Sequence, residues 1–150
     1  MVHHFLRVAE PVDWDVYHDI RRSALWDERG RTGYNAKLPG EYLSNHHSLL
    51  LKFDGRGIGT TRVDDCGDGT GVIRLVAITA DMRGRGHGRV LSTMVDDYAR
   101  SLGIRTLLVS AACDAEGFYS AMGWHRCREN YDHLLGVADD CIQMQKAIGS

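Results

Sequence analysis

The stretch M-R-G-R-G-H-G-R, residues 82–89, carries three glycines within five positions, framed by arginines. It follows an apolar run at residues 72–78 and opens an amphipathic run at residues 89–103. This order predicts a strand, a glycine loop and a helix. Such a loop directs several backbone N–H groups to one place, beside the positive end of the helix dipole. The stretch therefore predicts a site for an anion such as a phosphate or pyrophosphate.

The arginines of this loop form a local basic cluster in a chain whose positive and negative charges are nearly equal in number. The 150 residues contain 18 Lys and Arg against 20 Asp and Glu, a formal net charge of −2. We expect a single domain, residues 1–150, at this length. Because the net charge is negative and the arginines of the loop are not interleaved with aromatic residues, we expect no nucleic acid partner.

Cysteine spacing and hydropathy indicate the compartment. The four cysteines lie far apart without a C-x-x-C pair, which favours reduced thiols over a disulfide frame or a zinc site. Neighbouring residues on a strand point to opposite faces, so the pairs His3-His4 and His46-His47 make poor bidentate ligands, and we expect no metal. The chain begins without a signal pattern, and no apolar run approaches the roughly 20 residues of a membrane helix. We expect a cytoplasmic protein without a membrane partner.

Periodicity and turn signals predict the remaining elements. Turns at 54–57 and 64–71 separate strands at 47–53, 58–63 and 72–79, which predicts a three-strand antiparallel meander. We expect helices at 13–27, about 86–102 and 115–122. Residues 31–45 are predicted as a loop with a short helical turn. Further strands are predicted at 5–9, 106–110, 124–127 and 141–146. This order is that of a mixed α+β fold.

Two motifs in this element order resemble those of the GNAT superfamily of acyl-CoA-dependent N-acetyltransferases. Its cofactor motif, Q/R-x-x-G-x-G/A, is matched by Arg83, Gly86 and Gly88. About thirty residues later, F-Y-S-A-M-G-W at 118–124 matches the second motif, an aromatic-Tyr pair followed by Gly and an aromatic residue. The resemblance implies a central, mostly antiparallel sheet of six to seven strands with flanking helices, whose strands splay apart at the cofactor cleft.

The resemblance also implies acetyl-CoA as co-substrate and a role for each matching residue. Tyr119 corresponds to the residue that protonates the departing thiolate, and its reference pKa near 10 is close to that of an alkyl thiol. The positions implied to bind the cofactor are Val76, Ala77 and Ile78 on the strand edge, and Arg83, Gly84, Arg85, Gly86, His87, Gly88 and Arg89 around the pyrophosphate.

The implied reaction is transfer of an acetyl group to a primary amine of a small molecule, protein or peptide by direct attack. Many members carry a Glu in the fourth or fifth strand as general base, and an Asn near the end of the fifth. Here the strands offer Arg74 and Ser110 in place of the Glu, and Ser110 or Ala111 is nearest to the position of the Asn. This absence keeps a non-catalytic acyl-CoA sensor or partner subunit as the alternative. The candidate bases elsewhere are Asp64, Asp65, His46, His47 and Glu28.

The acceptor site is expected in the first helix, the loop after it, and the loop before the last strand. Residues 26–29 (W-D-E-R) and Tyr34-Asn35 have the polar and aromatic groups that suit a pocket. The late segment carries Glu129, Asp132, Asp139 and Asp140, which would suit a cationic acceptor. Dimers are common in the family, so a homodimer is a further expectation from the resemblance.

Overall fold

Three consecutive leucines in the second strand show how the sheet is covered. The computed structural model, which describes residues 2–128 and 141–149, places Leu49, Leu50 and Leu51 fully buried in β2 (His46–Phe53). Leu49 and Leu51 pack in the cluster that includes α2 (His87–Ser101), whereas Leu50 packs with α1 (Pro11–Arg21). Because consecutive strand residues point to opposite faces, the two helices cover opposite faces of the sheet.

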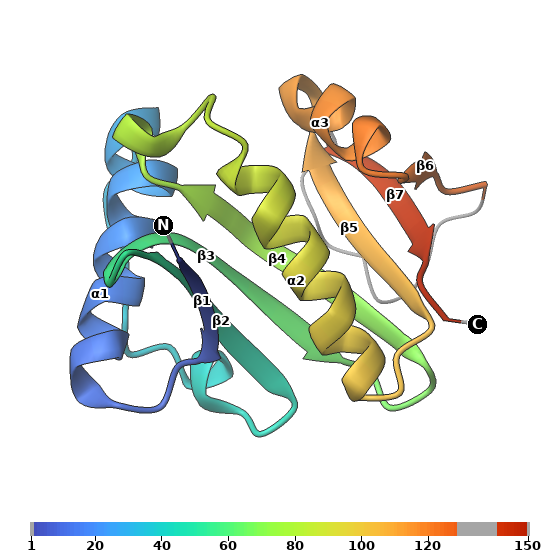
Figure 1. Cartoon of the computed structure of the whole chain (residues 1–150), viewed down its shortest axis with the longest axis horizontal. Helices are drawn as coiled ribbons and strands as arrows, with labels where there is room; N and C mark the ends of the chain where they lie inside the picture. Colours follow the sequence, from blue (N-terminus) through green and yellow to red (C-terminus); the bar gives the residue numbers. More distant parts are fainter. Residues whose placement is uncertain (1, 129–140, 150) are drawn as a thin grey trace.

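The sheet has seven strands within the described ranges, in the order β1-β2-β3-β4-β5-β7-β6. Only β4 and β5 are parallel, and all other neighbours are antiparallel. The predicted meander is confirmed as β2, β3 and β4, within a mostly antiparallel α+β fold (Figure 1). Besides β2, the strands are β1 (His3–Arg7), β3 (Arg56–Asp65), β4 (Thr70–Ile78), β5 (Thr106–Ala112), β6 (His125–Arg126) and β7 (Cys141–Ala147).

The helices differ from the prediction mainly before β2. The predicted helix at 13–27 begins two residues earlier, because Pro11 suits a first helical position, and its regular part ends at Arg21. A π-helical turn, η1 (Arg22–Trp26), and a 3₁₀ turn, η2 (Asp27–Arg29), continue it. The other short elements are η3 (Pro39–Tyr42), η4 (Ala80–Met82), η5 (Cys113–Ala115) and α3 (Glu116–Ala121).

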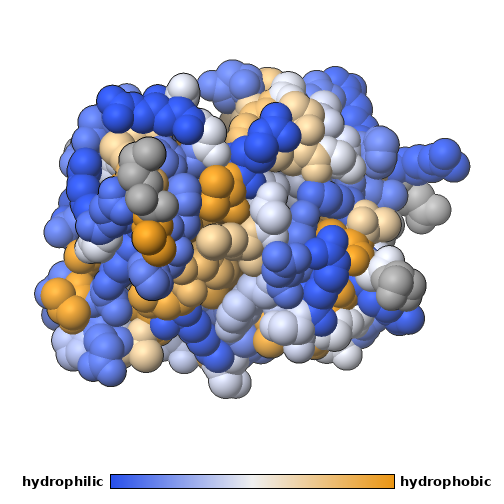
Figure 2. All heavy atoms as spheres, viewed as in Figure 1, coloured by the Kyte–Doolittle hydropathy of each residue, from blue (hydrophilic) through white to orange (hydrophobic). Residues whose placement is uncertain are grey.

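The core on the α2 side joins the two parts of the sheet, β1–β4 and β5–β7. Leu91 and Val95 of α2 are buried with Ile73 of β4 and Leu107 of β5. Burying each such side chain contributes about 1.5–3 kcal/mol, so α2 helps to hold together the two parallel strands β4 and β5. Figure 2 shows the face seen in Figure 1, where the border is mostly hydrophilic and apolar residues reach the surface mainly near the middle. No helix in the described ranges is long and apolar enough to cross a membrane.

The sheet opens between β4 and β5, as the resemblance implies. Their pairing ends at Ile73 with Val109, although β4 continues to Ile78 and β5 to Ala112. The register between β3 and β4 also shifts there, and Leu75 has a φ of +56°. A β-bulge of this kind bends its strand and leaves backbone groups without partners in the ladder. The bend and the end of pairing separate the two strands toward the top of Figure 1.

Candidate active site

The glycine loop ends in the exposed positive end of α2. Gly84 and Gly86 have φ values of +73° and +84°, a region that glycine adopts without penalty. The backbone N–H groups in the first turn of a helix lack intrahelical partners, and this first turn carries no acidic residue. A Cβ atom on Gly84 or Gly86 would meet no protein atom within 4 Å. The loop therefore borders open space at a helix end that favours an anion.

This space belongs to a cleft of about 600 Å³, within the size range of small-molecule sites. Its walls include Gly84, Gly86 and Arg89 on one side and Phe118 with Tyr119 of α3 on another. Gly88 lets α3 approach α2, since a Cβ there would lie 3.1 Å from the ring of Phe118. Open glycines, arginines and a helix end are the groups that bind a pyrophosphate, so the residues fit an acyl-CoA.

Two of the predicted loop residues, His87 and Arg85, do not line this cleft. The ring of His87 is buried against Phe53, and its Nδ1 lies 3.0 Å from Nε2 of His3. Arg85 is exposed and does not line the cleft. Within residues 2–128 and 141–149, no three His, Cys, Asp or Glu side chains converge as metal ligands would.

Arg83 connects the glycine loop to the end of β4 and to η2. Its Nε donates to the carbonyl oxygen of Ile78 at 2.9 Å, and its terminal nitrogens donate to both oxygens of Glu28 at 2.7 and 3.1 Å. The hydrogen bond from Arg83 holds the pKa of Glu28 below its usual range. A carboxylate whose pKa is lowered is a weaker base, so this candidate base is poorly suited to deprotonate an ammonium group.

Tyr119 lies where two clefts meet. It is 9% exposed and packs between the rings of Phe118 and Trp124, with ring centroids 5.4 and 5.5 Å away. Burial raises the pKa of Tyr119 to about 12, so its hydroxyl stays protonated at neutral pH. Tyr119 and Val76 line both the cofactor-side cleft and a second cleft of about 440 Å³. The shared wall brings the predicted proton donor and the predicted strand edge together.

The second cleft has a basic wall. Arg29, Arg31 and Arg74 line it, with Ser110 of β5. Arg29 and Glu28 come from the segment 26–29 that the sequence analysis assigned to a pocket, and Glu28 lines an adjoining cavity. Tyr34 lines neither cavity, because its hydroxyl hydrogen-bonds to His18 instead. Glu129, Asp132, Asp139 and Asp140, which suggested a cationic acceptor, lie outside the described residues.

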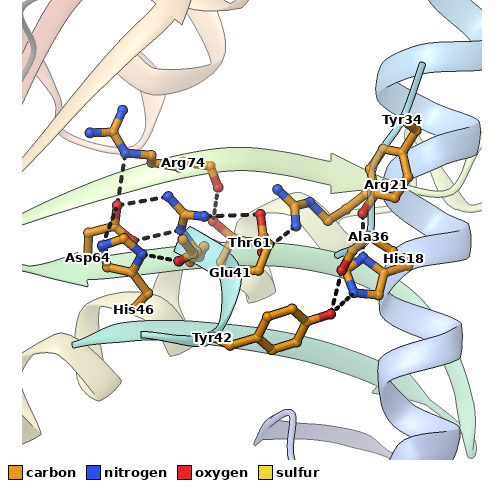
Figure 3. A network of polar contacts seen from close by, with 12 residues as sticks. His18, Arg21, Tyr34, Ala36, Glu41, Tyr42, His46, Thr61, Asp64 and Arg74 are labelled. Carbon is orange, nitrogen blue, oxygen red and sulfur yellow. Dashed lines mark hydrogen bonds and ion pairs between the residues drawn. The ribbon is translucent and has the colours of Figure 1, made fainter. Parts of the chain in front are cut away.

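A chain of ion pairs crosses the sheet from α1 to this cleft (Figure 3). Glu41 accepts from buried Arg21 at 2.7 Å and from Arg62 at 3.0 Å. Asp64 accepts from Nε of Arg62 at 2.7 Å and from Nε of Arg74 at 2.9 Å. The network fixes Arg74 at the cleft wall and occupies the carboxylate of Asp64.

The remaining candidate bases are also engaged away from the clefts. His46 approaches Asp64 at 3.6 Å, and His47 Nδ1 lies 2.7 Å from the hydroxyl of Tyr98. Asp65 accepts a hydrogen bond from the backbone of Gly67 in the turn after β3. None of these residues lines either cleft or the adjoining cavity. Of the five candidate bases, the structure brings only Glu28 near the site.

Sequence reasoning missed two charged residues of the site. Asp114 in η5 lines the cofactor-side cleft and the adjoining cavity, and Arg31 lines the second cleft. Asp114 could have been predicted, because it lies in the turn directly after β5, a strand that was expected to splay from its neighbour at the cofactor cleft. Arg31 lies in an irregular segment without periodicity, so no pattern pointed to it.

Comparison with known proteins agrees with this fold. Residues 32–134 match the family described as "Acetyltransferase (GNAT) domain". A GNAT-family acetyltransferase from Staphylococcus aureus superposes with a TM-score of 0.79 at 12% identity, covering 98% of this chain and 99% of that one. The ribosomal-protein-S18-alanine N-acetyltransferase from Escherichia coli gives 0.77 at 17% identity, with 99% and 96% covered. An aminoglycoside 6'-N-acetyltransferase complexed with coenzyme A gives 0.78 at 14% identity, with 100% and 98% covered.

Proposed function

The chain belongs to the GNAT acetyltransferase family and is an acyl-CoA-dependent N-acetyltransferase, and on this premise we propose that it acetylates a primary amine by direct attack. Acetyl-CoA is the co-substrate, and it supplies an acetyl thioester. The observation that carries the proposal is the meeting of two clefts at Val76 and Tyr119, one bordered by the glycine loop and one open to an acceptor. Family membership favours this enzyme over the non-catalytic alternative.

On the donor side, the loop and the strand edge would hold the cofactor. The N–H groups at the start of α2, with Arg83 and Arg89, would bind the pyrophosphate. Val76, Ala77 and Ile78 follow the bulge in β4, beyond the last residue that pairs with β5. Their backbone groups on the open edge would pair with the pantetheine arm, and one N–H would hold the carbonyl oxygen of the thioester.

At the meeting point, Tyr119 would donate a proton to the departing sulfur. Burial raises the pKa of Tyr119 to about 12, above that of an alkyl thiol. The phenol is therefore a weaker acid here than its reference pKa near 10 suggests, and it would release its proton only as negative charge develops on the sulfur. Such positioned proton donors contribute about 10²- to 10⁴-fold to rate. The acceptor nitrogen forms the new bond to the acetyl carbon as the carbon–sulfur bond breaks, and its surplus proton leaves through the water-accessible second cleft. The phenolate of Tyr119 then regains a proton from water.

Replacing Tyr119 by Phe tests this role. We expect the rate of CoA release with a saturating amine to fall by about 10²-fold or more, because the proton donor is lost. The affinity for acetyl-CoA, measured by calorimetry, should stay within about twofold, since the ring that packs against Trp124 remains.

Tyr98→Phe is the matched control, because Tyr98 sits on α2 and hydrogen-bonds to His47 outside both clefts. Its turnover should equal that of the parent chain. Undiminished turnover of the Tyr119 variant would remove Tyr119 from the mechanism. Absence of acetyl-CoA binding at millimolar concentration would overturn the proposed function itself.

A further inference from the structure

We infer that the acceptor is a small amine that also carries an anionic group, a carboxylate or a phosphate, held in the second cleft. The inference rests on the proposed function and adds the chemical class of the substrate. The cleft of about 440 Å³ suits a small molecule. It reaches Val76 and Tyr119, so an acceptor anchored there can present its nitrogen where the donor cleft begins.

Two of the three cations on the cleft wall have no ion-paired anionic partner among the described residues, whereas Arg74 is paired with Asp64. Arg29, Arg31 and Arg74 line the cleft, and no Asp or Glu of the described ranges does. Arg29 and Arg31 make no ion pair with any described residue, in contrast to Arg21, Arg62 and Arg83 nearby. Guanidinium groups bind carboxylate and phosphate oxygens in pairs, which orients an anion as well as attracting it.

A buried hydroxyl adds a second, independent observation. The Oγ atom of Ser110 is buried and has no hydrogen-bond partner among residues 2–128 and 141–149, and Ser110 lines the same cleft from β5. A buried hydroxyl without a partner is costly, so a ligand oxygen that accepts its proton would be favoured. Ser110 and the arginines stand on different walls of the cleft, and together they suit the several oxygens of one anionic group.

The irregular segment that carries Arg31 is held in place by aromatic residues. Tyr34 packs edge-on against Trp26 with centroids 4.7 Å apart. His18 contacts the hydroxyls of Tyr34 and Tyr42, at 2.5 and 3.2 Å. These contacts anchor the segment to α1 and η1, and the backbone N–H of Arg31 donates to the carbonyl oxygen of Trp26 at 2.8 Å. The backbone of Arg31 is therefore held beside the cleft, where its side chain is exposed to an incoming ligand.

The test compares amines that differ only in charge. CoA release is measured with a panel of amino acids, with the carboxamide of each, with aminoalkyl phosphates and with diamines. We expect kcat/KM for the best anionic amine to exceed that of its uncharged counterpart by about tenfold or more, the usual effect of a charge-assisted pair. Higher rates with the phosphates than with the acids would identify phosphate as the anionic group.

Variants separate charge recognition from folding. Arg31→Ala should reduce the preference for the anionic amine by about tenfold, whereas Lys37→Ala should leave it unchanged. Lys37 is an exposed cation of the same segment and does not line the cleft. Ser110→Ala should weaken binding of the anionic amine, measured by calorimetry with CoA present, without lowering the melting temperature, because it removes a hydroxyl that has no partner.

The outcomes distinguish this inference from the function beneath it. Equal rates for charged and uncharged amines, or a preference for diamines, would overturn the inference and leave the acetyltransferase proposal standing. The same holds if Arg31→Ala and Lys37→Ala behave alike. If no amine releases CoA, the proposed function fails and the inference fails with it.

Discussion

Gly86 and Leu75 both have a positive φ beside the clefts, and only the glycine could be read from the sequence. Gly86, with a φ of +84°, begins α2, and the G-x-G pattern predicted it. Leu75, with a φ of +56°, forms the bulge in β4. Bulky residues rarely adopt this conformation, and the run V-I-R-L-V-A-I contains no glycine to mark it. The bulge depends on the register with β3, which is a tertiary property.

Gly86→Ala tests the anion site at this scale. An alanine at positive φ costs about 1–2 kcal/mol of stability, and its methyl group would project into the cleft. We expect the affinity for acetyl-CoA to fall by about tenfold or more, measured by calorimetry.

Gly55→Ala provides the control, because Gly55 has the same φ of +84° and equally open surroundings but lies in the turn between β2 and β3. Both variants should lose similar stability in urea. If Gly55→Ala weakened acetyl-CoA binding as much as Gly86→Ala, strain alone would explain the effect and the loop would lose its assigned role.

The same contrast between local and tertiary signals holds for the elements. Helix α2 has a clear buried face and was predicted within a residue of its observed bounds. The first helix was predicted in one piece, whereas the structure changes to π and 3₁₀ turns after Arg21. Buried Arg21 pairs with Glu41 of η3 at that point. This contact joins segments twenty residues apart, so the periodicity of the helix could not reveal it.

His18 of α1 gives the segment that carries Arg31 a dependence on pH. Tyr42 donates to the carbonyl oxygen of Ala36, so it accepts from Nε2–H of His18, and Nδ1 accepts from Tyr34. These roles require a neutral ring. Burial, reinforced by the charge of Arg21, lowers the pKa of His18. The unfolded chain therefore binds this proton first as pH falls through about 6.5, and the stability that neutral His18 contributes is present above that pH and lost below it.

We therefore expect the KM for the acceptor to rise between pH 7 and pH 5 more than the KM for acetyl-CoA does, since the segment that carries Arg31 is released. Steady-state kinetics at several pH values, with the acceptor's own titration taken into account, would measure this. His18→Gln keeps hydrogen-bonding groups but does not titrate in this range, and it should flatten the difference. An unchanged pH profile in that variant would show that another group is responsible.

At the scale of the whole molecule, the two clefts meet where β4 and β5 stop pairing although both strands continue. The paired motifs predicted which strands flank the opening, since the resemblance implied splayed strands beside the glycine loop. The contents of the second cleft were beyond the sequence, because Arg31 and Ser110 are 79 positions apart and meet only across the gap between β4 and β5. Pairing between the halves is limited to the stretch from Thr70 with Thr106 to Ile73 with Val109, with α2 packed across it.

A ligand in the cofactor-side cleft should therefore act as a bridge between the two halves. Its walls come from β4 and the glycine loop on one side and from α3 on the other. We expect acetyl-CoA to slow amide hydrogen exchange both at residues 76–90 and at residues 115–122. A single bound ligand would contact both walls of the cleft, so both segments should be protected together. The turn between β2 and β3, which lies away from the cleft, should exchange at its unliganded rate. Protection at the loop alone, with 115–122 unchanged, would mean that α3 and its Tyr119 do not contact the bound cofactor.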